Sequence, residues 1–288
     1  MIGKVIKFYN SFFFVKVEGE IIPCKLRGLM KRDKNLGSAV YPGDEVEISK
    51  LPDNSGVIER ILMRKSLLNR PAVANVDRVI LTFAALSPDL NKLLLNKFIA
   101  LAEFSNIAEI VICVNKIDLI SDAENFLSDY ENLYKVVRTS AKENSGIEEL
   151  KKILSKGVTV FAGPSGVGKS SLMNSICPEI NLQVGSVSEK ILRGKHTTRV
   201  SELIEFGEGF IVDTPGFSAV DMNDSGFTKK NLRNCFKEFS AFAHECKFLN
   251  TCSHTHEPDC KVKKAVKEEK ILSERYESYL TMFKELKQ

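Results

Sequence analysis

A stretch in the middle of the chain has the pattern G-x-x-x-x-G-K-S, which requires a strand before it and a helix after it. It follows an apolar, β-branched run at 158–161 and precedes a run of helical character at 170–177. A glycine-rich loop between a strand and a helix lets backbone N–H groups converge on phosphate oxygens, and the helix N-terminus adds positive potential. The predicted phosphate loop consists of Gly163, Pro164, Ser165, Gly166, Val167, Gly168, Lys169 and Ser170.

Two side chains of this loop have predicted roles toward a nucleoside triphosphate. Lys169 is expected to reach the β- and γ-phosphates, and the hydroxyl of Ser170 is expected to bind Mg²⁺. The predicted nucleotide site also includes the next residue, Ser171. The stretch therefore predicts a magnesium-dependent nucleotide site.

A second motif predicts that the base is guanine. The tetrapeptide N-K-x-D follows a predicted strand at 109–114, and α/β sheets bind ligands at such strand ends. The carboxylate of Asp118 can accept hydrogen bonds from guanine N1–H and from the exocyclic amine, a donor pair that adenine lacks. Asn115 is expected to bond the base edge and orient the loop, and the stem of Lys116 to cover the base. An ATP-dependent kinase on the same phosphate loop is therefore disfavoured.

A third motif follows a predicted strand at 134–138. Ser140, Ala141 and Lys142 resemble the loop whose backbone N–H recognises guanine O6 in GTPases. This short motif carries weight only beside the other two.

Two stretches downstream have the pattern of segments that sense the nucleotide. The polar run at 192–199 looks like a switch loop, in which Thr198, or alternatively Thr197, completes the Mg²⁺ shell. A predicted strand then ends at the sequence D-T-P-G. There Asp213 would support Mg²⁺ through water, and the N–H of Gly216 would sense the γ-phosphate.

Residues 1–67 have the alternating pattern of a small β domain. Five short runs with turn signals between them predict strands at 4–8, 12–17, 20–25, 44–48 and 56–61. Five strands in so short a segment suggest a barrel of OB type. The three phenylalanines at 12–14 could stack bases and the basic residues from Lys25 to Lys34 could follow phosphates. Alternatively, the phenylalanines fill the barrel and the basic residues solvate a loop.

The amino-acid composition indicates what kind of partner the protein binds and in which cellular compartment it acts. The segments 1–67 and 221–288 carry 12 and 13 Lys and Arg against 8 and 11 Asp and Glu, which hints at a polyanion near the two ends. No apolar run approaches the roughly 18 residues of a membrane span, and the first residues lack the pattern of a signal peptide. We therefore expect a cytoplasmic protein without membrane contact. In a reducing compartment the four cysteines between 235 and 260 indicate a metal site.

The order of the motifs is unusual. Most small GTPases have the phosphate loop first and N-K-x-D and S-A-K last, whereas here those two motifs come first. Read as a circle, the order is preserved, so the same sheet can form with its termini moved to a surface connection. The former ends would be joined through 143–156, which contains a helix-like run at 147–154.

With these motifs in this order, the whole chain resembles the circularly permuted GTPases of the RsgA (YjeQ) type. The resemblance implies three domains: an OB-type β-barrel that binds RNA at 1–67, a circularly permuted α/β P-loop GTPase at 68–220, and a mainly helical zinc-binding domain at 221–288. It implies binding to the small ribosomal subunit and its rRNA, help in late maturation, and hydrolysis of GTP to GDP and phosphate. We expect a monomer. The alternative is an RNA-binding scaffold whose nucleotide site is structural.

The C-terminal segment offers ligands for one structural Zn²⁺. Cys246, Cys252, His254 and Cys260 form the pattern C-x5-C-x-H-x5-C, and three thiolates with one imidazole suit a closed tetrahedral site. Cys235 and His244 are alternatives to Cys246, and His256 is an alternative to His254. The charged stretch at 261–288 is expected to be helical.

Two further expectations concern hydrolysis. Ras-like GTPases place a water-orienting Gln directly after D-x-x-G, but this chain has Phe217, which predicts slow intrinsic turnover. The missing group would be His196 of the switch loop or a group supplied by the ribosome. Because only 217–225 join Gly216 to the last domain, we also expect a GTP-dependent clamp in which the barrel and the zinc domain hold rRNA until hydrolysis.

Overall fold

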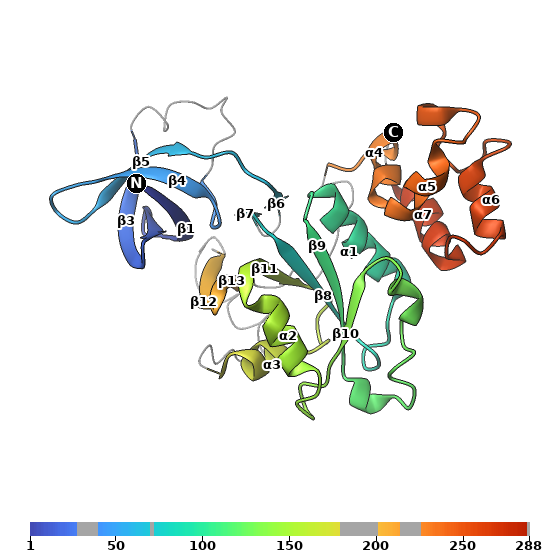
Figure 1. Ribbon diagram of the computed structural model, residues 1–288, viewed down its shortest axis with the longest axis horizontal. Helices are drawn as coiled ribbons and strands as arrows, with labels where there is room; N and C mark the ends of the chain where they lie inside the picture. The colour runs from blue at the N-terminus through green and yellow to red at the C-terminus, as the bar shows by residue number, and fades with distance from the viewer. Residues whose placement is uncertain (28–39, 70–71, 179–200, 214–225, 287–288) are drawn as a thin grey trace.

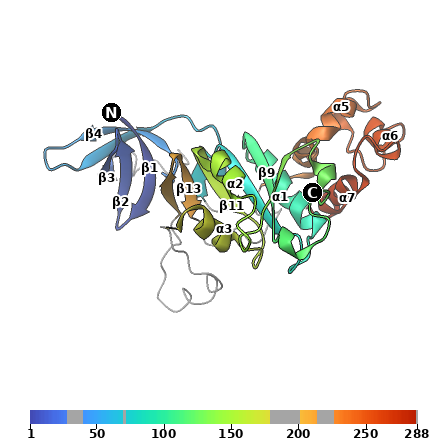
Figure 2. The same ribbon diagram turned by 60° about the horizontal axis from the view of Figure 1, so that its bottom comes forward.

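The computed structural model describes residues 1–27, 40–69, 72–178, 201–213 and 226–286. The molecule is elongated, with the N-terminal barrel at one end, a central sheet, and the C-terminal helices at the other end (Figures 1 and 2). No helix within these ranges is long and apolar enough to cross a membrane.

The N-terminal strands close into the predicted barrel, and their order in it is β1-β2-β3-β5-β4. The barrel consists of β1 (Ile2–Tyr9), β2 (Phe12–Val17), β3 (Glu20–Leu26), β4 (Glu45–Lys50) and β5 (Gly56–Ile61). Its core is built from alternating residues such as Val15, Val17 and Ile22, because successive side chains of a strand point to opposite faces.

The three consecutive phenylalanines of β2 have three different environments. Phe13 is part of the barrel core. Phe14 packs against the core of the central sheet. Phe12 is half-buried on the outer surface, with Lys25 Nζ 4.8 Å from its ring centroid. Base stacking by all three rings is therefore wrong, and only Phe12 stays a candidate. The basic residues Lys31, Arg32 and Lys34 lie outside the described part of the chain.

A short hairpin that the sequence did not predict follows the barrel. It consists of β6 (Leu67–Asn69) and β7 (Ala72–Ala74). The turn before β4 lies directly against it, since Ala74 N donates to Pro42 O over 2.9 Å. Gly43 has φ +93°, and a Cβ there would lie 2.0 Å from Ala74 O, so only glycine fits this joint.

Among the described residues, the central sheet has six strands in the order β10-β9-β8-β11-β13-β12, and of their pairs only β12–β13 is antiparallel. The strands are β8 (Arg78–Ala84), β9 (Glu109–Asn115), β10 (Lys135–Arg138), β11 (Lys156–Ala162), β12 (Glu202–Phe206) and β13 (Glu208–Asp213). Strands β8, β9 and β10 advance in one direction, and β11 then returns to the other side of β8. This reversal is where α/β sheets bind ligands.

Helices cover both faces of the sheet. Helix α1 (Lys92–Phe104) packs on one face, whereas α2 (Ile147–Leu154) and α3 (Lys169–Ile176) pack on the other. Helix α2 lies in the connection that the permutation requires. In the sequence, Ser87-Pro88-Asp89 predicts the start of a helix that runs to about Phe104. That start is wrong, because the N-cap of α1 is Asn91, whose side chain accepts from Leu94 N.

The C-terminal region is mainly helical. Its elements are α4 (Lys229–Leu232), η5 (Arg233–Cys235), η6 (Lys237–Phe239), α5 (Ser240–Ala243), η7 (Leu249–Thr251), α6 (Lys261–Lys267) and α7 (Ser273–Glu285). The helical stretch expected at 261–288 is two helices, because the chain turns at Glu269, which has φ +57°. Phe236, Phe239 and Tyr279 form the centre of this region's core.

Candidate nucleotide site and cysteine–histidine cluster

The predicted phosphate loop connects β11 to α3, the strand–loop–helix setting that the motif requires. Two of its glycines are fixed by close approach. Gly163 has φ +143° and a Cβ there would lie 2.0 Å from Thr82 O; at Gly168, φ +92°, it would lie 2.4 Å from Asn115 Nδ2. Side chains at either position would push the loop away from β8 and β9.

The ammonium of Lys169 lies within the phosphate loop. Its Nζ donates to Gly163 O over 2.7 Å and to Pro164 O over 2.6 Å. Burial lowers the pKa of Lys169 to about 8. Ser170 follows in the first turn of α3 and is half-buried. The loop thus holds a half-buried ammonium beside a hydroxyl at a helix start, a combination suited to a phosphate with its metal ion.

Asn115 ties the guanine motifs to the phosphate loop. It ends β9, and its Nδ2 donates to Val167 O over 2.9 Å. Its Oδ1 accepts from Ala141 N at 3.2 Å and from Thr139 Oγ1 at 3.3 Å. Lys116 Nζ bridges Gly166 O, at 2.8 Å, and Ser87 O. All three motifs therefore meet at one edge of the sheet.

Asp118 is exposed at this edge, where a ligand can reach it. Its Oδ1 accepts from Ser140 Oγ over 2.6 Å, and Ser140 Oγ itself accepts from Glu143 N over 3.0 Å. The buried Ser140 thus holds the carboxylate in a fixed orientation, whereas Lys142 is exposed and points to Glu143. A preorganised carboxylate with an open side suits recognition of a planar base with two donors.

Part of the predicted site falls outside the described residues: His196, Thr197, Thr198, Gly216 and Phe217. Asp213 is the last residue of β13. Because β13 pairs in parallel with β11, the backbone of Asp213 lies at the same sheet edge as the phosphate loop.

Two residues of the site had no predicted role. The carbonyl of Ser87, in the loop after β8, accepts from Lys116. Thr139 is buried, and its hydroxyl lies against Asn115 and Cys113. The position of β8 beside β9, which brings Ser87 close to Lys116, is a tertiary feature, so no local sequence signal could have found Ser87. Thr139 adjoins the S-A-K motif and could have been included.

Four predicted metal ligands come together in the C-terminal region. The ligand atoms of Cys246, Cys252, His254 and Cys260 all lie within 4.8 Å of one another, and all four residues are buried. Cys246 Sγ is 3.9 Å from Cys260 Sγ and 3.7 Å from His254 Nδ1, which is 3.4 Å from Cys260 Sγ. A tetrahedral zinc site with ordinary bond lengths requires separations of about 3.5–3.8 Å. The donor set therefore suits Zn²⁺, and the three separations among Cys246, His254 and Cys260 lie close to these values.

The alternative ligands lie elsewhere. Cys235 Sγ contacts Asn231 O at 3.7 Å, His244 is exposed with Nδ1 3.4 Å from Ser240 O, and exposed His256 contacts its neighbour Thr255. Helix α7 holds the cluster loop in place. There Tyr276 Oη donates to His254 O over 2.8 Å, and Tyr279 Oη donates to Ser253 O over 2.5 Å.

A phosphate loop, N-K-x-D and S-A-K at one edge of a mostly parallel sheet define a P-loop GTPase fold, here with the motifs in permuted order. A family model described as "RsgA GTPase" matches residues 61–223, and one described as "RsgA N-terminal domain" matches residues 2–58. The chain belongs to the RsgA family of GTPases.

Relatives and solved structures agree over the full length. Proteins named small ribosomal subunit biogenesis GTPase RsgA, from Clostridium beijerinckii and Alkaliphilus metalliredigens, are each 45% identical over 99% of this chain and 97% of their own. The crystal structure of YjeQ from Thermotoga maritima is 41% identical with a TM-score of 0.85, covering 99% of this chain and 98% of that one. YloQ, described as a circularly permuted GTPase, is 33% identical with a TM-score of 0.82, covering 99% and 94%.

Proposed function

We propose that this protein is a ribosome-stimulated GTPase that binds the small ribosomal subunit and assists its late maturation. One observation carries the guanine assignment: Ser140 holds Asp118 at 2.6 Å, at the sheet edge that also carries the phosphate loop. The relatives that span the chain are named for small-subunit biogenesis, which supports the partner. We place the activity in the cytoplasm and expect the protein to act as a monomer.

The nucleotide would bind with Mg²⁺. In this proposal the phosphate loop and Ser171 surround the phosphates. The ammonium of Lys169 exchanges its hydrogen bonds to Gly163 O and Pro164 O for contacts with the β- and γ-phosphates. Ser170 and Thr198 would hold the metal directly and Asp213 through water, while the N–H of Gly216 would sense the γ-phosphate. His196 stays the candidate for positioning the attacking water.

We propose that the cysteine–histidine cluster binds one structural Zn²⁺. Cysteine binds Zn²⁺ as a thiolate. Because burial raises the pKa of the Cys252 thiol to about 12, this residue is protonated before the metal binds, and binding would release protons. The metal would fix the loop between α5 and α6, which contains the short turn η7 and is bonded to α7 through Tyr276 and Tyr279.

We propose that the barrel supplies an RNA contact around Phe12. Tyr9, which is 61% exposed and paired with Phe12 across β1 and β2, offers a second ring, and Lys25 adds a cation. Aromatic rings beside cations suit single-stranded RNA. The proposed boundaries of the RNA-binding, GTPase and zinc domains remain 1–67, 68–220 and 221–288.

The test is GTP hydrolysis by the purified protein with and without isolated small ribosomal subunits. We expect slow basal turnover, because Phe217 replaces the water-orienting Gln, and a large stimulation by subunits. Slow turnover that subunits leave unchanged would contradict the partner assignment and favour the scaffold. His196→Ala that retains full stimulated turnover would exclude His196.

A second measurement tests the clamp. Subunit affinity is compared between a non-hydrolysable GTP analogue and GDP. We expect tighter binding with the analogue, and equal affinities would remove the clamp.

A further inference from the structure

The C-terminal domain does not depend on residues 217–225 alone for its attachment, because it packs directly on the central domain. Residues of α1, among them Ala100 and Leu101, belong to the same apolar core as Phe236 and Tyr279. Figure 1 shows α7 beside α1 on the side of the sheet that carries β9 and β10. This is the side of the guanine motifs.

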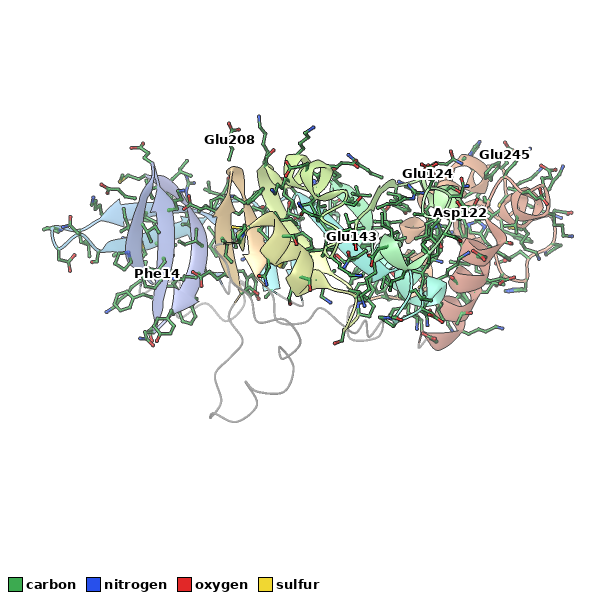
Figure 3. All side chains as sticks on the ribbon, turned by 90° about the horizontal axis from the view of Figure 1, so that it is seen from below. Phe14, Asp122, Glu124, Glu143, Glu208 and Glu245 are labelled. Carbon is green, nitrogen blue, oxygen red and sulfur yellow. The ribbon has the colours of Figure 1, made fainter. Side chains whose placement is uncertain are left out.

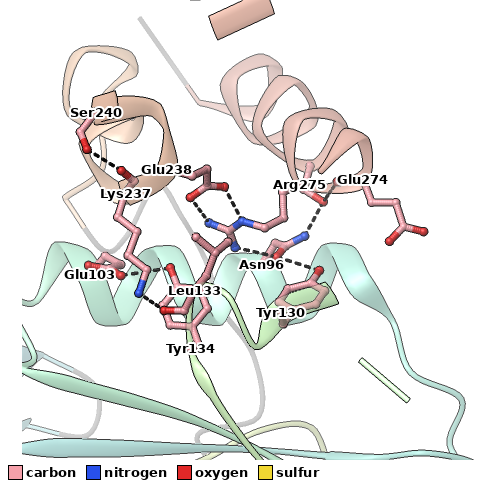
Figure 4. A network of polar contacts seen from close by, with 11 residues as sticks. Asn96, Glu103, Tyr130, Leu133, Tyr134, Lys237, Glu238, Ser240, Glu274 and Arg275 are labelled. Carbon is pink, nitrogen blue, oxygen red and sulfur yellow. Dashed lines mark hydrogen bonds and ion pairs between the residues drawn. The ribbon is translucent and has the colours of Figure 1, made fainter. Parts of the chain in front are cut away.

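The contact contains a buried ion pair. The guanidinium of Arg275, 1% exposed, meets the carboxylate of Glu238, 8% exposed, through Nε–Oε1 at 2.5 Å and Nη2–Oε2 at 3.0 Å. The third donor, Nη1, reaches Asn96 Oδ1 of α1 over 3.0 Å (Figure 4). Arg275 thus uses its planar fork on both sides of the domain boundary, a geometry that lysine cannot reproduce.

Asn96 also contacts the segment that follows the N-K-x-D motif in the chain, so it connects this segment to Arg275. Its Oδ1 also accepts from Tyr130 Oη at 3.2 Å, and its Nδ2 donates to Ser278 Oγ over 2.9 Å. Lys237 Nζ donates to Leu133 O and lies over the ring of Tyr134 (Figure 4). The C-terminal domain therefore holds the segment 130–134 by side chains from two of its own elements.

That segment connects the two guanine motifs in the chain. Figure 3 shows Asp122 and Glu124, which lie between the N-K-x-D motif and this segment in the chain, at the end of the molecule occupied by the C-terminal helices, opposite Phe14 of the barrel. Leu127 and Tyr130 share one core with Ile117, the neighbour of Asp118. Packing thus links the segment to the N-K-x-D motif.

A second link leads to the S-A-K motif. Arg138, the last residue of β10, donates from Nη2 to Phe126 O over 2.9 Å and from Nη1 to Glu131 Oε1 over 2.6 Å. Two residues later, Ser140 holds Asp118. The chain between the two guanine motifs therefore contacts the strand that leads into the S-A-K loop as well as the C-terminal domain.

We propose that Arg275 and the docked C-terminal domain position the guanine-recognising loops, so that docking raises the affinity for GTP and GDP alike. The inference rests on the proposed guanine site. Without the Arg275–Asn96 hydrogen bond, the segment 130–134 is held less firmly against the C-terminal domain. The loops of the N-K-x-D and S-A-K motifs must then become ordered when the base binds. Ordering at the moment of binding lowers affinity. Arg275 is thus a positioning residue that never touches the nucleotide.

The test compares dissociation constants for GDP and a non-hydrolysable GTP analogue in the full-length protein, well below its melting temperature. Arg275→Met keeps the volume and removes the fork; we expect binding of both nucleotides to weaken about 10-fold. Tyr130→Phe removes one hydroxyl, and we expect a loss of about 3-fold with the fold retained. The control is Lys97→Gln, which breaks an exposed pair with Glu285 in the same helix contact and leaves both constants unchanged.

Each outcome of this comparison either supports or overturns the inference. A merely structural role would lower the melting temperature and leave the dissociation constants unchanged, which overturns the inference. A loss confined to the GTP analogue would place the coupling at the γ-phosphate and also overturn it. If Arg275→Met does not fold, Tyr130→Phe decides alone. Wild-type protein that binds no guanine nucleotide would refute the proposed function before any variant is compared, and the inference would fall with it.

Discussion

At the scale of single residues, Lys169 links nucleotide binding to pH. Burial lowers its pKa to about 8, so from roughly pH 8 to 10 the unfolded chain carries a proton that the free folded protein has lost. This group therefore makes the stability of the free protein rise with pH in that window. Phosphates favour the charged ammonium, so binding should take up about half a proton at pH 8.

Calorimetry of GDP binding at pH 8, in buffers of different ionisation enthalpy, measures this uptake. The control is the same titration at pH 7, where Lys169 is already mostly charged and the uptake should be small. Equal proton uptake at the two pH values would contradict the assignment of the phosphate contact to Lys169.

The second prediction at this scale concerns Asp118. Asp118→Asn replaces an acceptor by an amide, which cannot accept from both guanine donors but can donate to the O2 carbonyl of xanthine. We expect GDP affinity to fall about 100-fold and xanthosine diphosphate to bind better than GDP. Competition against a fluorescent nucleotide measures both; Asp122→Asn, an exposed change just outside the motif, is the matched control.

At the scale of elements, the cysteine–histidine cluster should determine the order of the loop between α5 and α6. We expect one zinc per chain, lost in Cys252→Ser and retained in Cys235→Ser, a buried cysteine outside the cluster. Because the pKa of Cys252 is raised to about 12, metal binding must displace protons and should tighten as pH rises. Zinc content and chelator titrations at two pH values measure this; an affinity that falls with pH would contradict it.

The elements also show where sequence patterns are informative. The five barrel strands and the strands that carry the guanine motifs extend over four residues or more, so their alternating or apolar patterns could be recognised. Strands β6 and β7 have three residues each, too few for a pattern. The start of α1 was misplaced because Pro88 resembles a helix start, whereas the side chain of Asn91 provides the cap.

At the scale of the whole molecule, Asp44 fixes the connector that leads from the barrel strands to the central domain. Its carboxylate is fully buried and accepts from Arg64 Nε at 2.6 Å, from Arg64 Nη2 at 2.8 Å, and from Tyr41 N at 2.8 Å. Asp44→Ala leaves these donors without the carboxylate and should destabilise the protein by about 3 kcal/mol in urea unfolding.

The exposed pair between Lys7 and Glu202 offers the matched control, because it joins the barrel to the sheet. Lys7→Gln should change the free energy of unfolding by less than about 0.5 kcal/mol. Equal effects of Asp44→Ala and Lys7→Gln would show that burial of the ion pair does not determine its contribution to stability.

The chemistry proposed for the site can be predicted from short stretches of the sequence alone. Binding of phosphate, guanine or zinc requires particular side chains within four to fifteen consecutive residues, so each motif can be recognised from a short stretch of sequence. The permuted order is recognised once the first and last motifs are treated as adjacent. The cysteine–histidine cluster was predicted for the same reason.

The contacts between the domains, in contrast, follow from packing in three dimensions. In sequence, Arg275 is one more charged residue of a helix; its burial and its bond to Asn96, 179 positions earlier, follow from the packing of α7 on α1. The roles of Ser87, Phe13 and Phe14 were likewise set by neighbouring strands and domains. Such contacts join segments distant in the chain, and their free energy depends on mutual burial, which no local pattern records.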